Sequence, residues 1–240
     1  MSPRLLSLAP SIIAVLAAGV AIKVKPKARF RSTAQHLAAG VVFAAVALEL
    51  LPDLMQRREV VPTAIGFAVG VALLLGLRAF EKRSAKSSDA ELSPSYVITI
   101  AVDLLIDGLV LGIGFAAGQS QGILLTIALS LEMLSLGLAL ASQALSTKWS
   151  SVKTLALVVG VSGVLPAGTF TGSLILPRLP PAAFTGVLAF GVAAMLYLAT
   201  EELLVEAHEQ PDTAFSAATF FVGFLAILVL DILIGSAVGK

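Results

Sequence analysis

The sequence predicts an all-α integral membrane protein with eight transmembrane helices in a single domain, residues 1–240, and three observations favour this fold class. Hydrophobic residues make up 58% of the 240 residues, and the mean hydropathy of +0.98 is far above that of soluble domains. Charged residues make up 13%, about half the usual fraction. Apolar runs recur along the chain, and at about 20 residues per span its length holds about eight helices and no separate soluble domain.

Eight apolar runs separated by polar or charged residues are the predicted spans. They lie at residues 5–22, 34–55, 60–80, 93–118, 121–145, 152–175, 181–208 and 214–238. Five basic residues follow the first run and one, Arg4, precedes it, which is the reverse of a signal peptide, so we expect a retained span. Residues 81–91, rich in Ser, Lys and acids, are the predicted flexible loop.

The distribution of Lys and Arg predicts the orientation of these spans. Cytoplasmic loops hold the excess of basic residues. The first, third, fifth and seventh connections together hold eleven of the 16, and the opposite side holds five. We therefore expect a multi-pass protein of the cell (inner) membrane with both termini outside the cytoplasm.

Composition also excludes several classes of function. The absence of cysteine rules out disulfides, thiolate metal sites and thiol redox chemistry. The sequence shows no sign of nucleic-acid binding. The expected partners are the lipid bilayer, metal ions and, as an open alternative, a second copy of the chain in a homodimer.

An internal repeat links two acidic segments. Glu49-Leu-Leu-Pro-Asp53, near the end of the second span, matches Glu202-Leu-Leu-Val-Glu206, near the end of the seventh. The predicted orientation makes these spans antiparallel, and inverted repeats of this kind are typical of transporters. The sequence thus predicts a 3+2+3 arrangement, in which three helices, two central helices and three helices follow one another. We expect these acids and the adjacent Glu201 to line a transport pathway.

The fourth span carries two acids in an otherwise apolar run. Asp103 and Asp107 are four residues apart, so they share one face of a helix. Each Asp near the centre of a membrane helix costs about 2.5–3.5 kcal/mol to insert, so a bound cation or shared protons must compensate. The alternative for Asp103 is a shorter helix that leaves this residue at a hydrated end.

The fifth span adds a third acid, Glu132, followed by Ser135. A short connection at residues 119–122 makes the fourth and fifth helices antiparallel neighbours, which brings Glu132 to the level of Asp107. With Asp103 these carboxylates form an oxygen-rich cage suited to a divalent cation. The alternative is a protonated Glu132 that is hydrogen-bonded between helices. Ser135 is expected to lie on the transport pathway.

Three motifs resemble the ZIP (Zrt/Irt-like) family of divalent metal transporters, in particular its bacterial GufA-like branch. Leu50-Leu-Pro-Asp53 resembles the family's second-span Leu-Leu-Pro-Glu, and Asp107-Gly-Leu-Val-Leu-Gly112 resembles its fourth-span acid-Gly-Leu-Ala-Ile-Gly. Ala194-Met-Leu-Tyr197 with Glu201-Glu-Leu203 resembles its seventh-span motifs. The resemblance implies eight spans, both termini outside, and a metal site between the fourth and fifth helices that is often binuclear.

Departures from the family pattern concern the metal site. Asp103-Leu104 stands where the family has His-Asn, and Glu132 is followed by Ser135-Leu136 where the family has Pro-Glu. Leu165 stands before Pro166 where some members have Glu. The resemblance therefore implies that the second metal has lost its ligands, while the first site survives in all-carboxylate form.

We expect a secondary transporter, not an enzyme, that moves Zn²⁺-class ions through Asp103, Asp107 and Glu132, with Mn²⁺, Fe²⁺ and Cd²⁺ as alternative substrates. Two acids would neutralise the ion while the third exchanges between metal and proton. One alternative is a ZIP-like protein that binds metal without transport or carries another cation. An intramembrane metal-dependent hydrolase is less favoured, since both histidines, His36 and His208, lie near span ends and no nucleophile-base pair is visible.

Overall fold

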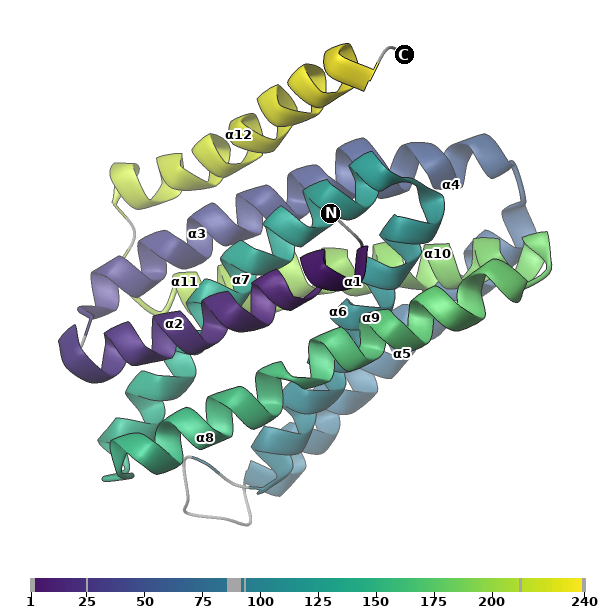
Figure 1. The fold of residues 1–240 in the computed structure, drawn as a ribbon. Helices are drawn as coiled ribbons and strands as arrows, with labels where there is room; N and C mark the ends of the chain where they lie inside the picture. The colour runs from purple at the N-terminus through teal and green to yellow at the C-terminus, as the bar shows by residue number, and fades with distance from the viewer. Residues whose placement is uncertain (1–2, 25, 86–91, 93, 212, 239–240) are drawn as a thin grey trace.

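The computed structural model describes residues 3–24, 26–85, 92, 94–211 and 213–238. Within these ranges every regular element is a helix and no strand is present. The long helices lie side by side in one bundle (Figure 1). The predicted all-α fold class is thus confirmed for the described part of the chain.

Short connections link the helices. In chain order they are α1 (Pro3–Leu6), α2 (Leu8–Val24), α3 (Ala28–Ala45), the π-helix η1 (Val46–Leu50), α4 (Leu51–Arg57), α5 (Val60–Ala85), α6 (Pro94–Ala117), α7 (Gln119–Ser146), α8 (Ser151–Ser162), α9 (Val164–Ile175), the 3₁₀-helix η2 (Leu176–Arg178), α10 (Pro181–Tyr197), the π-helix η3 (Leu198–Leu203), α11 (Leu204–Ala207) and α12 (Ala214–Val238).

Seven of the described helical stretches are long and apolar enough to cross a membrane. They are Ala28–Arg57, Val60–Phe80, Tyr96–Ala117, Gln119–Ser146, Ser151–Arg178, Pro181–Ala207 and Ala214–Leu233, and each corresponds to a predicted span. Helix α2 covers the predicted first span and is apolar, but its 17 residues extend only about 25 Å. An eighth span therefore stays a prediction.

Two predicted boundaries were wrong. The predicted loop at 81–91 starts too early, because α5 continues through Ala85. Residues 81–85 contain no Gly or Pro to end a helix, so their charge alone does not stop it. The remainder of that loop, residues 86–91, lies outside the described residues. The link between the fourth and fifth helices is Gly118 alone, since α7 already begins at Gln119.

The sixth span is interrupted near its middle, between α8 and α9. Pro166 has no N–H to donate to the carbonyl of Ser162, four residues before it. The hydroxyl of Ser11 on α2 donates to this carbonyl instead, at 2.6 Å. The break in the helix therefore leaves no orphaned acceptor at Ser162, and it ties the sixth span to α2.

Two π-helical segments occupy equivalent positions in the predicted repeat. Segment η1 ends at Leu50, directly after Glu49 of the first copy of the repeat. Segment η3 ends at Leu203, directly after Glu202 of the second copy. Pro52 accounts for part of η1, because it offers no N–H to the preceding turn. The corresponding Val205 has an N–H, so proline is not the common cause. Such π-segments occur frequently at functional sites.

The helices pack most extensively in four pairs, which are α2 with α7, α6 with α9, α3 with α12, and α5 with α10. Glycines permit close approach in each pair, because an added Cβ would collide with the backbone of the partner helix. These contacts are Gly137 with Ala14, Gly108 with Leu165, Gly40 with Phe220, and Gly66 with Gly186. The first two pairs form one group of helices and the last two a second group, joined mainly where α7 packs against α3.

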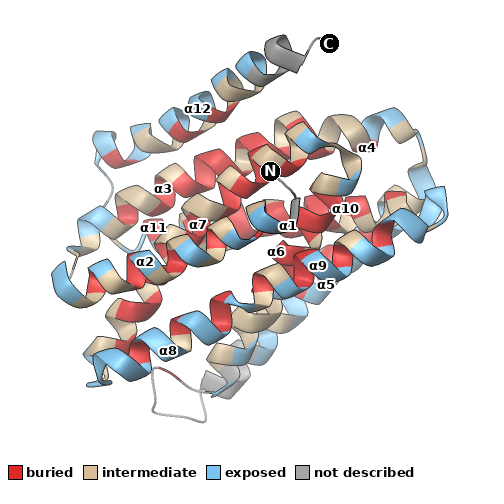
Figure 2. Ribbon diagram, in the orientation of Figure 1, coloured by how far each residue is buried: buried red, intermediate tan, exposed pale blue. Residues whose placement is uncertain are grey.

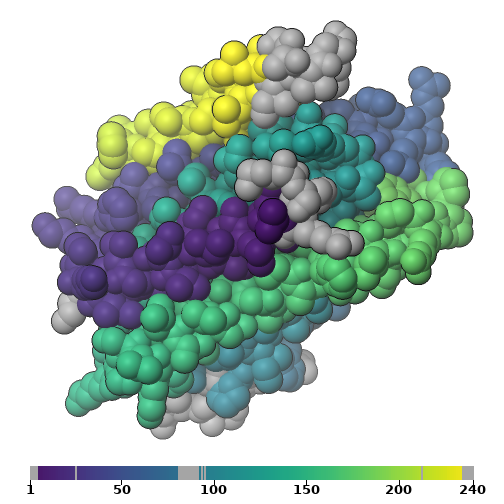
Figure 3. Space-filling view, in the orientation of Figure 1, coloured from purple at the N-terminus to yellow at the C-terminus, as the bar shows by residue number. Residues whose placement is uncertain are grey.

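Burial differs strongly between central and outer helices. Within an apolar stretch of 18 residues, 67% are buried in α7 but only 17% in α5 and in α12. Figure 2 shows the same contrast between α7 and the outer helix α12. The exposed side chains of these outer helices include large apolar ones such as Phe67, Phe215 and Phe221. In Figure 3, α2 and α8 lie next to each other on the surface of the bundle and α12 lies along its edge. An apolar exterior of this extent fits contact with lipid rather than water.

Candidate metal site

Helices α6 and α7 form a tight antiparallel hairpin that positions the three predicted acids. Asp103 and Asp107 lie on one face of α6, and Glu132 lies on α7. Gly118 is the single residue between the helices: its N–H donates to the carbonyl of Gly114 on α6 at 3.0 Å, and its carbonyl accepts from the N–H of Gly122 on α7 at 3.1 Å. The hairpin therefore holds its two helices in a fixed register, which sets the height of Glu132 relative to Asp107.

The structure brings these three carboxyl groups together. One oxygen from each of Asp103, Asp107 and Glu132 lies within 4.8 Å of the others. The side chains of Asp107 and Glu132 are buried, at 2% and 3% exposure, and Asp103 is partly exposed. Asp103 also lies more than two turns inside α6, so the alternative of a hydrated helix end does not hold. These residues are called the acid triad below.

Several polar atoms at the triad are buried without a hydrogen-bond partner among the described residues. They are Oδ2 of Asp107, Oε2 of Glu132 and Oγ of Ser135. Buried polar atoms in proteins nearly always have a hydrogen-bond partner. A bound ion or other species at the triad would supply the partner that these three atoms lack. Carboxylate and hydroxyl oxygens are suitable ligands for a divalent cation, and the donors present thus fit such an ion.

A cavity of about 210 Å³ adjoins the acid triad. Asp103 and Glu132 line it, and so do four other residues predicted to lie on the pathway, Ser135, Glu201, Glu202 and Glu206. Since a water molecule takes up about 30 Å³ of liquid, the cavity has room for an ion with part of its hydration shell. It is referred to below as the triad cavity.

A second cavity of about 520 Å³ continues from the first towards one end of the bundle. Tyr96 and Glu206 line both cavities. The other walls come from the start of α3, the end of α7 and the residues after α11. Glu206 accepts a hydrogen bond of 2.5 Å from Nε2 of Gln35 on α3. The two cavities thus adjoin at Tyr96 and Glu206, and the second lies at the end of the bundle that carries the first, fifth and seventh connections.

Two residues predicted to lie on the pathway, Glu49 and Asp53, are not among the residues that line the two cavities. Glu49 is 5% exposed within η1, and it lines none of the described cavities. Asp53 pairs with Arg57 on α4 at 3.4 Å, one helical turn away. The role of these two acids in transport stays a prediction.

Sequence reasoning missed other residues of the triad cavity. Tyr96 and Thr99 lie on the same face of α6 as Asp103, and this helical spacing was a usable signal. Tyr197 comes from the end of α10. Arg78, which lies inside the predicted span 60–80 but was counted with the basic residues of the third connection, belongs to α5 and forms an ion pair with Glu201. Nothing in the sequence indicated this contact.

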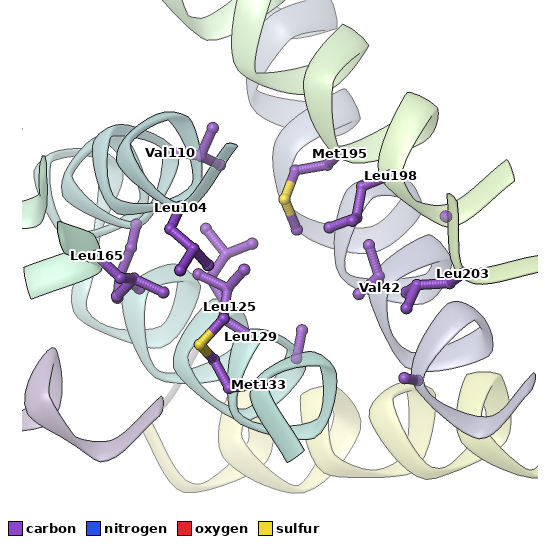
Figure 4. Packing of buried hydrophobic residues seen from close by; sticks show 14 of the residues in the cluster. Val42, Leu104, Val110, Leu125, Leu129, Met133, Leu165, Met195, Leu198 and Leu203 are labelled. Atoms are coloured by element: carbon purple, nitrogen blue, oxygen red, sulfur yellow. The ribbon is translucent and has the colours of Figure 1, made fainter. Parts of the chain in front are cut away.

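Leucines occupy the three positions where the family resemblance implied ligands for a second metal. Leu104 and Leu165 are fully buried, and both lie in the apolar core near Leu125 and Leu129 of α7 (Figure 4). Leu136 is half-buried and contributes a hydrocarbon wall to the triad cavity. An ion at these positions would meet no ligand atom from these side chains.

Comparison with known proteins gives two matches. The sequence model of one protein family, described as ZIP Zinc transporter, matches residues 82–231. A relative named zinc transporter GufA, from Myxococcus xanthus, is 28% identical over 207 residues, which make up 85% of this chain and 73% of the relative. The family match includes α6, α7, η3 and thus every residue of the acid triad.

Proposed function

Because the chain belongs to the ZIP zinc transporter family, we propose that it moves divalent metal ions, with Zn²⁺ as the expected substrate, through the acid triad between α6 and α7. The family consists of transporters, and the chain is accordingly a multi-pass membrane protein rather than an enzyme. The interpretation as an intramembrane hydrolase is set aside. In agreement with this, neither His36 nor His208 lines the triad cavity.

The acid triad carries the proposal. Three carboxyl groups within 4.8 Å of one another, two of them almost fully buried in a membrane-spanning hairpin, require compensation by positive charge. No basic residue is among the donors of the triad itself. A divalent cation would supply this charge and would also satisfy the unpartnered oxygens of Asp107 and Glu132.

One ion per chain is expected at this site. The family resemblance places the ligands of a second ion at Leu104, Leu136 and Leu165, which are hydrocarbon here. The remaining site has carboxylates but no imidazole. Carboxylates suit harder ions such as Mn²⁺ comparatively well, so selectivity for Zn²⁺ over Mn²⁺ should be weaker than at sites with His ligands, with Fe²⁺ and Cd²⁺ as further candidates.

The proposed fold has eight spans in a 3+2+3 inverted repeat, with α2 as the first span. Two observations support the repeat. The π-segments η1 and η3 lie at equivalent places in the second and seventh spans. The helix pairs also correspond. The repeat relates α2 to α9, α3 to α10, α5 to α12 and α6 to α7. The contact of α2 with α7 is therefore equivalent to that of α9 with α6, and the contact of α3 with α12 is equivalent to that of α10 with α5.

Both cavities open towards the end of the bundle that the charge distribution assigns to the cytoplasm. The proposed orientation, with both termini outside an inner membrane, therefore makes this an inward-open arrangement. An ion that leaves the triad would pass Tyr96 and Glu206 to reach the cytoplasmic side. A homodimer is compatible with the exposed apolar faces of α5 and α12, because either a second copy of the chain or lipid could cover them.

Metal uptake by purified protein in liposomes tests the proposal. We expect accumulation of Zn²⁺ and of harder divalent ions, and its loss in Asp107→Asn and Glu132→Gln. Asp231→Asn on α12, whose carboxylate lies outside the described cavities, is the matched control and should transport normally. Binding of one ion per chain without uptake would favour the alternative of a metal-binding protein that does not transport. Uptake that survives both triad variants would move the site elsewhere.

A further inference from the structure

Arg78 occupies an unexpected place for a basic residue in a cation pathway. Among the described residues that line the triad cavity, it is the one with a permanent positive charge. Its guanidinium forms an ion pair with Glu201 of η3, and Tyr197, at the end of α10, is a further hydrogen-bonding neighbour. A divalent cation that enters the cavity therefore meets a fixed charge of its own sign.

The ion pair is more exposed than the two buried acids of the triad. The side chains of Arg78 and Glu201 are 31% and 47% exposed, whereas Glu132 is 3% exposed. Both groups nevertheless line the same cavity. The pair thus forms a more exposed part of the cavity wall than Glu132 does.

We propose that Arg78 is a tethered counter-cation that sets how tightly the triad cavity holds its metal ion. By pairing with Glu201, Arg78 withholds this carboxylate from a passing ion, and the guanidinium charge opposes the ion directly. A transport site must release its ion as well as bind it, and a resident positive charge in the wall of the same cavity favours release. This role rests on the proposed function and adds a residue that determines affinity.

The charges predict opposite effects for the two partners. Arg78→Gln frees Glu201 and removes the repulsion, so the affinity for Zn²⁺ should rise about tenfold, with lower KM and lower Vmax because release is slower. Glu201→Gln leaves the guanidinium without its partner in the cavity, so the affinity should fall. The double variant Arg78→Gln/Glu201→Gln restores the charge balance and should lie between the single variants.

Equilibrium binding of Zn²⁺ to purified protein, together with uptake kinetics in liposomes, provides the test. Arg78→Lys keeps the charge and should stay near the wild type. Arg57→Gln is the matched control, because it removes an arginine of similar exposure from an ion pair outside the cavity and should leave binding unchanged. Size-exclusion profiles identify variants that do not fold. If Arg78→Gln does not fold, the weaker Zn²⁺ binding expected of Glu201→Gln still tests the proposal.

Unchanged affinity in both Arg78→Gln and Glu201→Gln would overturn the role of Arg78. A rise in the double variant equal to that in Arg78→Gln would also overturn it, because the effect would then not involve Glu201. Failure of the proposed function gives a different result, since wild-type binding would be absent or insensitive to Asp107→Asn. Loss of binding in Asp107→Asn with no effect of the Arg78 variants would leave the metal site standing and refute the counter-cation alone.

Discussion

Neutralising Asp107 should make the metal-free protein more stable and abolish its response to metal. The oxygens of the acid triad lie within 4.8 Å of one another, so each pair of ionised carboxylates repels by about 3 kcal/mol or more at an effective dielectric constant of about 20. Asp107→Asn keeps the shape of the side chain and removes two of the three repulsive pairs. Since shared protons already relieve part of this repulsion, we expect a gain of about 1–3 kcal/mol in the free energy of unfolding without metal.

Thermal unfolding in detergent with and without Zn²⁺ measures both effects. At a free Zn²⁺ concentration one hundred times the Kd, binding stabilises the wild type by about 2.7 kcal/mol, which corresponds to a rise in Tm on the order of 5–10 °C. Asp107→Asn should show a higher Tm without metal and little rise with it. The control Asp231→Asn should respond like the wild type. A full metal-dependent rise in Asp107→Asn, or a lower Tm of this variant without metal, would refute the reasoning.

Three further predictions concern topology, packing and selectivity. In this cysteine-free chain, an impermeant thiol reagent applied to intact cells should label Met55→Cys and not Ser150→Cys, both of which lie at exposed positions; the reverse pattern would invert the proposed orientation. Gly137→Ala should lower stability by about 1–3 kcal/mol because its Cβ meets the backbone of α2, whereas Gly19→Ala, which has open space, should be neutral or slightly stabilising in the same unfolding assay. Asp103→His should increase the preference for Zn²⁺ over Mn²⁺ in equilibrium binding, and an unchanged preference would show that the missing imidazole is not what sets selectivity.

The features of the fold that are set by residues close together in the sequence, namely the spans and the hairpin of α6 and α7, were predictable. Hydropathy located the seven spans that meet the length criterion, since a membrane helix must be long and apolar. The acid triad followed from helical spacing on α6 and from the short link to α7, because a tight hairpin fixes the relative height of its helices. Boundaries such as the end of α5 were less accurate, because charged residues can continue a helix into water.

Contacts between helices that are distant in the chain were not predictable in the same way. Spacing shows which residues share a face of one helix, but it does not show the rotation of α5 relative to η3. The ion pair of Arg78 with Glu201 depends on that rotation.

The π-helical segment η3 explains how Tyr197, which sequence reasoning missed, comes to line the same cavity as Glu206, which it predicted. In a regular helix each residue turns by about 100°, so Tyr197 and Glu206 would lie about 180° apart and could not face one cavity. A π-segment adds about one residue to a turn and rotates everything after it back by about 100°, which leaves the two side chains about 80° apart. Tyr197, Glu201, Glu202 and Glu206 then all face the triad cavity, as the structure shows. The irregular turn thus gathers four polar side chains of one apolar helix on the side where the proposed ion passes, and regular spacing predicts no such gathering.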